Sequence, residues 1–442
     1  MQLINKRYIL ELVKLALPIF MGNIGIILIN AGDCFVAGRY STNSLAAVSI
    51  ATAIHATVSM LGVGLLLSVS PLLSNIRGAG IQAKKYFYPT VKFAFLIALI
   101  LLLLTLSYIP LLDYLGYEQD LLKEVKSYTF IIAFSSFGMI LHVALKEFLQ
   151  AYEIVFLPNF IMLVSVLLNV VLNFIFVFGL LGSPEIGTAG LALASLIART
   201  GAGFYLLGFC LYKFSFEKFC DRKFYKQIIK IGFPISMAIV IEFLSFNSMA
   251  ILLGRISGLY AAAQNIIMTL ANMSFMFPLA ISNAIAVKVG FANGAKNYKE
   301  LVTYVKNGII ITVGFMLCAS IFFATCSKYL AGIFTTDSSL INVIIPVMYV
   351  VAAFQISDGM QVAMGGVFKG LKKTNIVMYS NLIAYLLIGV SSGYYCALHF
   401  KHHLFAFWCA FASSSFLLTL ILIICLLRYL RGLDYRIKDV HS

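Results

Sequence analysis

One carboxylate, Asp358, lies inside a long apolar stretch that ends at a cluster of lysines. If the stretch is helical, Gln355, Asp358, Gln361 and Gly365 fall at i, i+3, i+6 and i+10 and share one helix face. A charged side chain in the middle of a membrane-spanning helix costs about 2.5–3.5 kcal/mol on insertion scales, so such residues usually mark an ion or substrate path. Asp358 is therefore the first candidate for a functional residue.

Two further carboxylates, Asp33 and Glu242, also lie inside apolar runs, whereas the other acidic residues flank such runs. Asn23 and Asn30 share the helix face of Asp33. A desolvated carboxylate accepts either a proton or a hard cation, because both remove its buried negative charge. We therefore predict that Glu242 and Asp358 bind the ion of an exchange reaction, with Na⁺ as the candidate metal ion. The alternative is that neighbouring amides satisfy these acids and that they are structural.

Other polar residues follow helical spacing in the apolar runs. Asn169 and Asn173 lie one turn apart, Ser195 lies in the next run, and Gln264 and Asn265 lie in the second half. The two asparagines are predicted either as cation ligands or as interhelical hydrogen-bonding residues, which contribute only about 0.6 kcal/mol each in membrane proteins. Arg199, also inside a run, is either a counter-ion for Asp33 or a residue whose head reaches the membrane surface.

The composition defines the elements that must position these residues. The chain is 61% apolar and 11% charged, with a mean hydropathy of +0.97, against roughly 25% charged residues in soluble domains. A helix of about 20 apolar residues crosses a bilayer. Twelve runs of this kind are predicted, with approximate cores at residues 12–36, 45–75, 88–110, 127–150, 156–181, 188–212, 230–253, 259–287, 305–326, 341–368, 375–398 and 404–427.

The basic residues predict an orientation. Most of the 32 lysines and arginines fall in alternate connections and at the two ends of the chain. By the positive-inside rule, both termini are then cytoplasmic.

The net charge of +15 is spread between the runs and forms no single patch, which argues against nucleic acid as a partner. The eight cysteines are scattered without a CxxC or Cys/His spacing, so no zinc-type site is predicted.

An internal repeat divides the chain. The segment from Lys14 to Pro18 resembles the segment from Lys230 to Pro234, and Gly-Arg pairs follow both at the same spacing. Each half then holds six spans, an even number, so the halves run parallel about an axis along the membrane normal. We predict an all-α polytopic membrane protein of twelve transmembrane helices in two six-helix lobes related by a pseudo-two-fold. The predicted boundaries are 1–212, a cytoplasmic linker at 213–229, and 230–442.

Several longer segments make the chain similar to the multidrug and toxic compound extrusion (MATE) family, NorM-type branch. They are Asp33-Cys-Phe-Val-Ala-Gly-Arg39, Leu168-Asn-Val-Val-Leu-Asn-Phe-Ile-Phe-Val-Phe-Gly179, Pro184-Glu-Ile-Gly-Thr-Ala-Gly190, and Gln355-Ile-Ser-Asp-Gly-Met-Gln361 with Phe368-Lys-Gly370. The resemblance implies export of organic, often cationic, compounds in exchange for inward Na⁺ or H⁺ by alternating access. The chain would then be a monomer in the cell inner membrane, would be no enzyme, and would need no cofactor beyond the coupling ion.

The resemblance also implies roles for the residues singled out above. Glu242 and Asp358 match the C-lobe carboxylates of cation coupling, and Asp33 matches the N-lobe acid. Asn169, Asn173 and Ser195 match polar positions of an N-lobe cation site. Two departures leave the coupling ion open: Phe354 stands where relatives often carry Tyr, and Gln264-Asn265 replaces a His-Gln pair.

Other functions remain as alternatives. The runner-up is a lipid-linked precursor flippase of the same superfamily, which the acidic character of the cavity candidates disfavours because its cargo is anionic. An intramembrane enzyme would need a nucleophile or metal motif, and the sequence contains no HExxH or GxSxG. A passive channel would not require buried acids at different positions in the two halves.

Overall fold

The computed structural model describes residues 5–214, 217–219, 221–400 and 403–441, and every element in these ranges is a helix. Twelve helical segments of the described chain are long and apolar enough to cross a membrane, as predicted. The elements are α1 (Lys6–Tyr40), α2 (Thr42–Leu66), α3 (Val69–Gly78), η1 (Ala83–Tyr86), α4 (Phe87–Tyr108), η2 (Ile109–Leu115), α5 (Gln119–Gln150), α6 (Phe156–Phe178), η3 (Leu180–Gly182), α7 (Thr188–Lys213), α8 (Arg222–Ile256), α9 (Gly258–Gly294), α10 (Tyr298–Thr325), α11 (Ser327–Phe334), α12 (Ser338–Gly370), α13 (Thr374–Asn381), η4 (Leu382–Val390), α14 (Ser391–His399) and α15 (His403–His441).

The helices form two compact units. Residues 18–236 make up the N-terminal unit, and residues 237–442 together with residues 1–17 make up the C-terminal unit. The division therefore falls at Pro18 inside α1 and two residues after Pro234 inside α8. A proline removes a backbone hydrogen bond from the helix interior, so each helix can change direction where it leaves one unit. The predicted lobe boundaries follow the internal repeat and differ from these packing units at both helices.

Specific contacts hold the start of α1 on the C-terminal unit. The Asn5 backbone N–H donates to Asn307 Oδ1 at 3.2 Å, and Lys288 Nζ lies 3.5 Å from Glu11 Oε2. The Tyr304 hydroxyl also donates to Glu11, and the Tyr8 and Tyr304 rings meet edge to face at 4.8 Å. These contacts explain why residues 5–17 pack with the second half of the sequence.

The start of α8 is held on the N-terminal unit in a corresponding way. Ser236 Oγ donates to the Leu61 carbonyl at 2.8 Å, and Ser68 Oγ donates to the Ile228 carbonyl at 3.2 Å. Gly232 lies so close to Leu65 that an added Cβ would stand 2.6 Å from the Leu65 carbonyl oxygen. Small residues thus allow the backbones of α8 and α2 to approach each other.

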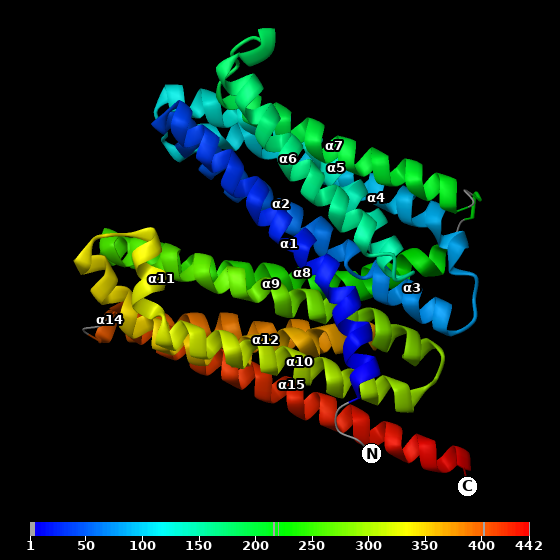
Figure 1. The fold of residues 1–442 in the computed structure, drawn as a ribbon. Helices are drawn as coiled ribbons and strands as arrows, with labels where there is room; N and C mark the ends of the chain where they lie inside the picture. Colours follow the sequence, from blue (N-terminus) through cyan, green and yellow to red (C-terminus); the bar gives the residue numbers. More distant parts are fainter. Residues whose placement is uncertain (1–4, 215–216, 220, 401–402, 442) are drawn as a thin grey trace. The chain divides into compact units, whose positions relative to one another are not determined.

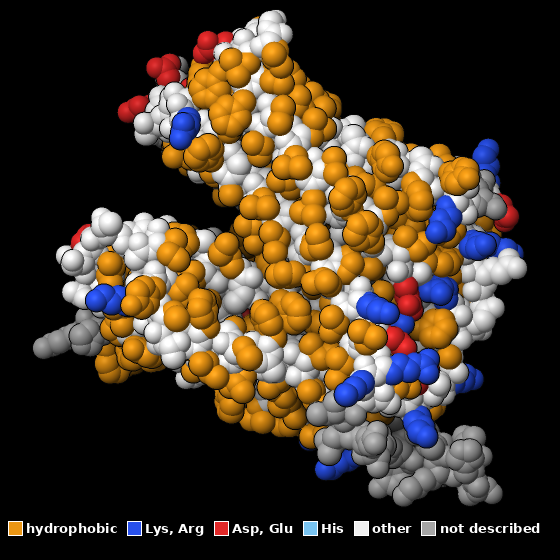
Figure 2. Space-filling view, viewed as in Figure 1, with side chains coloured by type: hydrophobic (Ala, Val, Ile, Leu, Met, Phe, Trp, Pro, Cys, Tyr) orange, Lys and Arg blue, Asp and Glu red, His pale blue; other side chains and the backbone are white. Residues whose placement is uncertain are grey.

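Within each unit the core lies along one pair of closely packed helices. In the N-terminal unit α5 packs along α7, and in the C-terminal unit α12 packs along α9 and also contacts α10 and α15 (Figure 1). The visible flanks of the helices carry mostly hydrophobic side chains, while most visible Lys and Arg side chains gather toward one end of the helices (Figure 2). Large apolar residues on these flanks are exposed, as expected for surfaces that face lipid.

Candidate functional site

The two acidic residues of the C-terminal unit come from different helices and lie near each other. Asp358 lies on α12 and is 5% exposed, and Glu242 lies on α8. The negative charge of Asp358 acts on the Glu242 carboxyl group, as does the positive charge of Lys369, three turns farther along α12. Gln361 Nε2 donates to Asp358 Oδ1 at 3.2 Å. The structure therefore brings together three residues that the sequence had placed on two separate helices.

The eleventh span places Glu242 within this cluster. Asn381 Nδ2 donates to the Ala238 carbonyl at 3.4 Å, one turn before Glu242. The Phe246 and Tyr385 rings meet at 6.2 Å, one turn after Glu242. Because these contacts bracket Glu242, its carboxyl group is held beside the spans that carry Asp358 and Tyr385.

Hydrogen bonds on both sides of α12 hold Asp358 in place. Ser357 Oγ lies 3.1 Å from Ser415 Oγ on α15, and Thr419 Oγ1 donates to the Ser357 carbonyl at 2.9 Å. On the other side, Gln355 Nε2 donates to Ser274 Oγ on α9 at 2.6 Å. The carboxylate therefore lies on a helix whose rotation is fixed by two neighbours.

Tyr385 is a residue of this cluster that the sequence analysis missed. It lies in η4, a π-helical stretch, and its side chain is fully buried. Its hydroxyl interacts with the Asp358 carboxylate and lies within electrostatic range of Glu242. Phe354 stands where relatives often carry a tyrosine, and it provides no phenolic oxygen. Its ring packs against Trp408 at 5.6 Å and Phe411 at 6.3 Å. In the sequence, Tyr385 is marked only by its position one helical turn after Asn381. Tyrosines that face lipid can also lie one turn from a polar residue, so this spacing did not identify Tyr385.

The adjacent pair Gln264 and Asn265 does not join this cluster. Gln264 is fully buried, and its Oε1 accepts a hydrogen bond of 2.9 Å from Trp408 Nε1. Asn265 is exposed on the neighbouring face of α9. Successive helix positions point about 100° apart, so one face cannot present both side chains. Gln264 instead supports the aromatic wall formed by Phe354, Trp408 and Phe411.

The N-terminal unit contains a second polar cluster, built around Asp33. Asn173 Nδ2 donates to Asp33 Oδ1 at 2.7 Å, and Ser195 Oγ donates to Asp33 Oδ2 at 3.1 Å. Asn169 Nδ2 donates to Ser195 Oγ at 3.1 Å. All four side chains are at most 2% exposed. The structure thus groups the four N-terminal residues that the sequence analysis selected, from α1, α6 and α7.

A positive charge accompanies this cluster. Arg199 lies one helical turn after Ser195, and its charge acts on the Asp33 carboxyl group. The guanidinium donates to Ser135 Oγ at 3.3 Å. The α5–α7 approach that makes this contact depends on Gly138, where an added Cβ would stand 2.4 Å from Thr200 Cα. Of the two interpretations of Arg199, the structure favours a counter-charge for Asp33.

The donor atoms of both clusters are oxygens and amide nitrogens. Among the described residues no group of three or more His, Cys, Asp or Glu side chains is placed to hold a metal ion, and the seven cysteines described are free. The eighth, Cys220, lies outside the described residues. Carboxylate, amide and hydroxyl oxygens are suited to a proton or to a hard monovalent cation.

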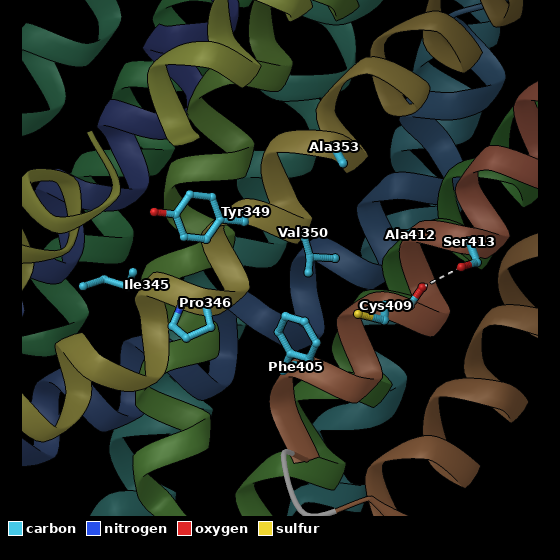
Figure 3. A pocket seen from close by; sticks show the side chains of 9 residues that line it. All are labelled: Ile345, Pro346, Tyr349, Val350, Ala353, Phe405, Cys409, Ala412 and Ser413. Atoms are coloured by element: carbon cyan, nitrogen blue, oxygen red, sulfur yellow. Dashed lines mark hydrogen bonds between the residues drawn. The ribbon is translucent and has the colours of Figure 1, made fainter. Parts of the chain in front are cut away.

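A separate apolar pocket of 670 Å³ lies between α12 and α15 in the C-terminal unit. Figure 3 shows the side chains around it, where the Ser413 hydroxyl donates to the Cys409 carbonyl at 2.8 Å. None of the predicted site residues lines the pocket, whose wall consists of Ile345, Pro346, Tyr349, Val350, Ala353, Phe405, Cys409, Ala412 and Ser413.

Comparisons with known proteins agree over nearly the whole chain. The MatE family matches residues 18–175 and 234–395. A probable multidrug resistance protein NorM from Idiomarina loihiensis is 29% identical over 88% of this chain and 87% of its own length. Another from Bacillus subtilis is 27% identical over 90% of each chain. Among solved structures, a MOP superfamily transporter from Pyrococcus furiosus matches 97% of both chains with a TM-score of 0.86 at 19% identity.

Proposed function

The chain belongs to the MatE family of membrane transporters, and on this basis we propose that it is a secondary active multidrug efflux antiporter. It exports organic, often cationic, compounds in exchange for inward Na⁺ or H⁺ by alternating access. The observation that carries the proposal is the pair of interacting carboxylates on separate helices, the buried Asp358 and the half-buried Glu242.

The coupling ion binds in the C-terminal unit. The two carboxylates interact there, and the charge of each disfavours the charge of the other, so a bound positive species favours ionisation of both. In the N-terminal unit a single acid, Asp33, already accepts two hydrogen bonds and interacts with the charge of Arg199. The C-terminal cluster therefore has the greater need for an external cation or proton.

Charge movement supplies the driving force. One positive charge that moves inward across 100 mV contributes about 2.3 kcal/mol, which supports a roughly 50-fold concentration gradient of a neutral substrate. Because the ion neutralises the carboxylates, its arrival and departure change the free energy of the two conformations by different amounts. An ion can shift a conformational equilibrium only through such a difference.

The antiport proposal is tested by Asp358→Asn and Glu242→Gln in proteoliposomes. Uptake of a fluorescent organic cation is measured under an imposed Na⁺ gradient and, separately, under a pH gradient. Each variant is expected to lose gradient-driven transport by at least tenfold. The control is Asp113→Asn, because Asp113 is half exposed and forms an ion pair with Lys126. Full gradient-driven transport by both carboxylate variants would refute the proposal.

We assign the protein to the inner membrane as a monomer, with both termini in the cytoplasm. The placement of most basic residues in alternate connections supports this orientation. A reporter active only in the cytoplasm, fused after Ser442, should be active. Activity of a periplasmic reporter at the same position would contradict the assignment.

A further inference from the structure

Packing holds the ring of Tyr385 in place, and its hydroxyl can donate a hydrogen bond to either of two acceptors. Its ring stacks on Phe411 at 5.1 Å and meets Phe246 at 6.2 Å. Gly389, one turn farther along η4, allows α15 to approach, since an added Cβ would stand 2.6 Å from Ser414 Oγ. A π-helical turn shifts the side chains that follow it relative to an α-helix, and such turns are frequent at functional sites. The phenolic oxygen is thus held at a fixed point beside the carboxylates.

The phenolic hydrogen has two acceptors within reach. One is the Asp358 carboxylate, and the other is Ser415 Oγ at 3.4 Å. A single hydroxyl hydrogen can be donated fully to only one of them. Because the ring is fixed, the choice between the two acceptors is made by rotation of the O–H bond alone.

The Ser415 direction continues through an ordered chain of hydrogen bonds. Ser415 Oγ lies 3.1 Å from Ser357 Oγ, and Ser357 Oγ in turn donates to the Phe354 carbonyl at 2.9 Å. Donation from Tyr385 to Ser415 is therefore compatible with donation from Ser415 to Ser357 and from Ser357 to the backbone. When the Tyr385 hydrogen follows this direction, an oxygen lone pair faces the carboxylates.

We propose that Tyr385 is a Na⁺ ligand of the C-terminal unit and that Ser415 accepts its hydrogen when the ion binds. The proposal rests on the antiport function proposed above. Without Na⁺ the Tyr385 hydroxyl donates to Asp358. With Na⁺ the hydrogen turns to Ser415, and the phenolic oxygen joins the carboxylate oxygens of Asp358 and Glu242 around the ion. Oxygen ligands of this kind are those that hard cations prefer.

The test measures the Na⁺ concentration that half-saturates thermal stabilisation of the purified full-length protein in detergent, with choline chloride at constant ionic strength. Tyr385→Phe keeps the ring and removes the oxygen, so the midpoint is expected to rise about tenfold. Ser415→Ala leaves the hydroxyl hydrogen directed at Asp358, so the midpoint should rise several-fold. Ser415→Thr retains an acceptor and should stay within twofold of the wild-type value.

Tyr394→Phe is the matched control, because Tyr394 lies in the same span and its hydroxyl donates to the Ser248 carbonyl at 3.2 Å. The proposal is overturned if Tyr385→Phe leaves the midpoint unchanged or if Tyr394→Phe raises it equally. Should Tyr385→Phe fail to fold, the comparison of Ser415→Ala with Ser415→Thr decides, and equal midpoints for these two count against the proposal.

The two proposals fail separately. If Na⁺ does not stabilise the wild-type protein while Asp358→Asn still loses pH-driven transport, Tyr385 is not a Na⁺ ligand and the antiport function stands. If Tyr385→Phe raises the Na⁺ midpoint while both carboxylate variants transport normally, the antiport proposal fails and the ligand assignment stands.

Discussion

At the scale of single residues, the two acidic clusters differ in what satisfies their charge. Asp33 receives hydrogen bonds from Asn173 and Ser195 and is influenced by Arg199. Asp358 accepts a hydrogen bond of 3.2 Å from Gln361, interacts with the Tyr385 hydroxyl and is close to a second carboxylate. A buried charge that protein donors already satisfy has less to gain from a bound cation. We therefore expect substitutions in the N-terminal cluster to alter stability more than ion affinity.

Asn173→Ala tests this expectation. The substitution removes the donor 2.7 Å from Asp33 and leaves a buried carboxylate with one hydrogen bond fewer, which costs about 1.5–3 kcal/mol for a charged group. The melting temperature of the purified protein should fall by several degrees, since ~1 kcal/mol corresponds to about 2–4 °C for units of this size. The double variant Asp33→Asn/Asn173→Ala should lose less than the two single losses combined.

The control for this prediction is Asn247→Ala, because Asn247 is exposed and its amide donates to the Phe243 carbonyl of its own helix. Its melting temperature should stay within about 1 °C of the wild-type value, in line with most exposed substitutions. Equal losses for Asn173→Ala and Asn247→Ala would show that Asp33 does not depend on its donor.

At the scale of elements, the ion site depends on how closely α12 approaches α9. Gly366 lies two turns after Asp358, and an added Cβ would stand 2.2 Å from the Ser282 carbonyl oxygen. Ser282 Oγ donates to the Val362 carbonyl at 2.8 Å, which joins the same two helices. A clash with backbone cannot be relieved by a side-chain rotation, so the helices must separate.

Adjacent glycines allow a matched comparison. Gly366→Ala should lower the melting temperature by more than 5 °C and reduce gradient-driven transport at least tenfold, because α12 carries Asp358. Gly365→Ala should leave both unchanged or raise stability slightly, since no atom lies within 4 Å of the added Cβ and Ala favours helix. Similar behaviour of the two variants, measured side by side, would show that close approach at Gly366 does not position the site.

At the scale of the whole molecule, each unit includes a helical segment that the repeat assigns to the other half. Residues 5–17 pack with the rest of the C-terminal unit through Glu11, which contacts Lys288 at 3.5 Å and accepts a hydrogen bond from Tyr304. The two units are therefore connected through continuous helices at Pro18 and at Pro234. We therefore expect residues 6–17 of α1 to move with the C-terminal unit if α1 bends at Pro18.

Glu11→Gln tests the attachment of this segment. The change removes the ionic part of the Lys288 contact, which is largely buried, with a Lys288 side chain 11% exposed. Amide hydrogen exchange of residues 6–17 should become at least threefold faster, while exchange in residues 18–40 stays unchanged. Arg7→Gln is the control, because the Arg7–Glu11 pair is exposed and such pairs contribute about 0–1 kcal/mol. Equal acceleration along all of α1 would contradict an attachment confined to the first 17 residues.

Local composition was enough to predict the class of protein and the number of spans, because lipid requires about 20 apolar residues for each span. It was not enough to predict which acids are buried. Asp33 and Asp358 are buried, but Glu242 is half-buried, and Glu147, which was not selected, is 2% exposed. The resemblance to the MATE family assigned Asp33, Asn169, Asn173 and Ser195 to one half of the protein, and the structure brings these side chains together. The sequence did not indicate which side of α9 faces the protein interior. Gln264 and Asn265 were both predicted as site residues, although only Gln264 is buried.

How residues from distant spans meet depends on tertiary packing. Tyr385 reaches Asp358 because η4 is π-helical and packs on α8, and no local pattern distinguishes it from a tyrosine that faces lipid. No local pattern predicted that residues 5–17 pack with the C-terminal unit, because this packing depends on side chains such as Tyr304 and Lys288 that lie nearly 300 positions away. Composition sets the free energy of insertion for each span, whereas contacts between spans depend on the relative rotation and approach of whole helices.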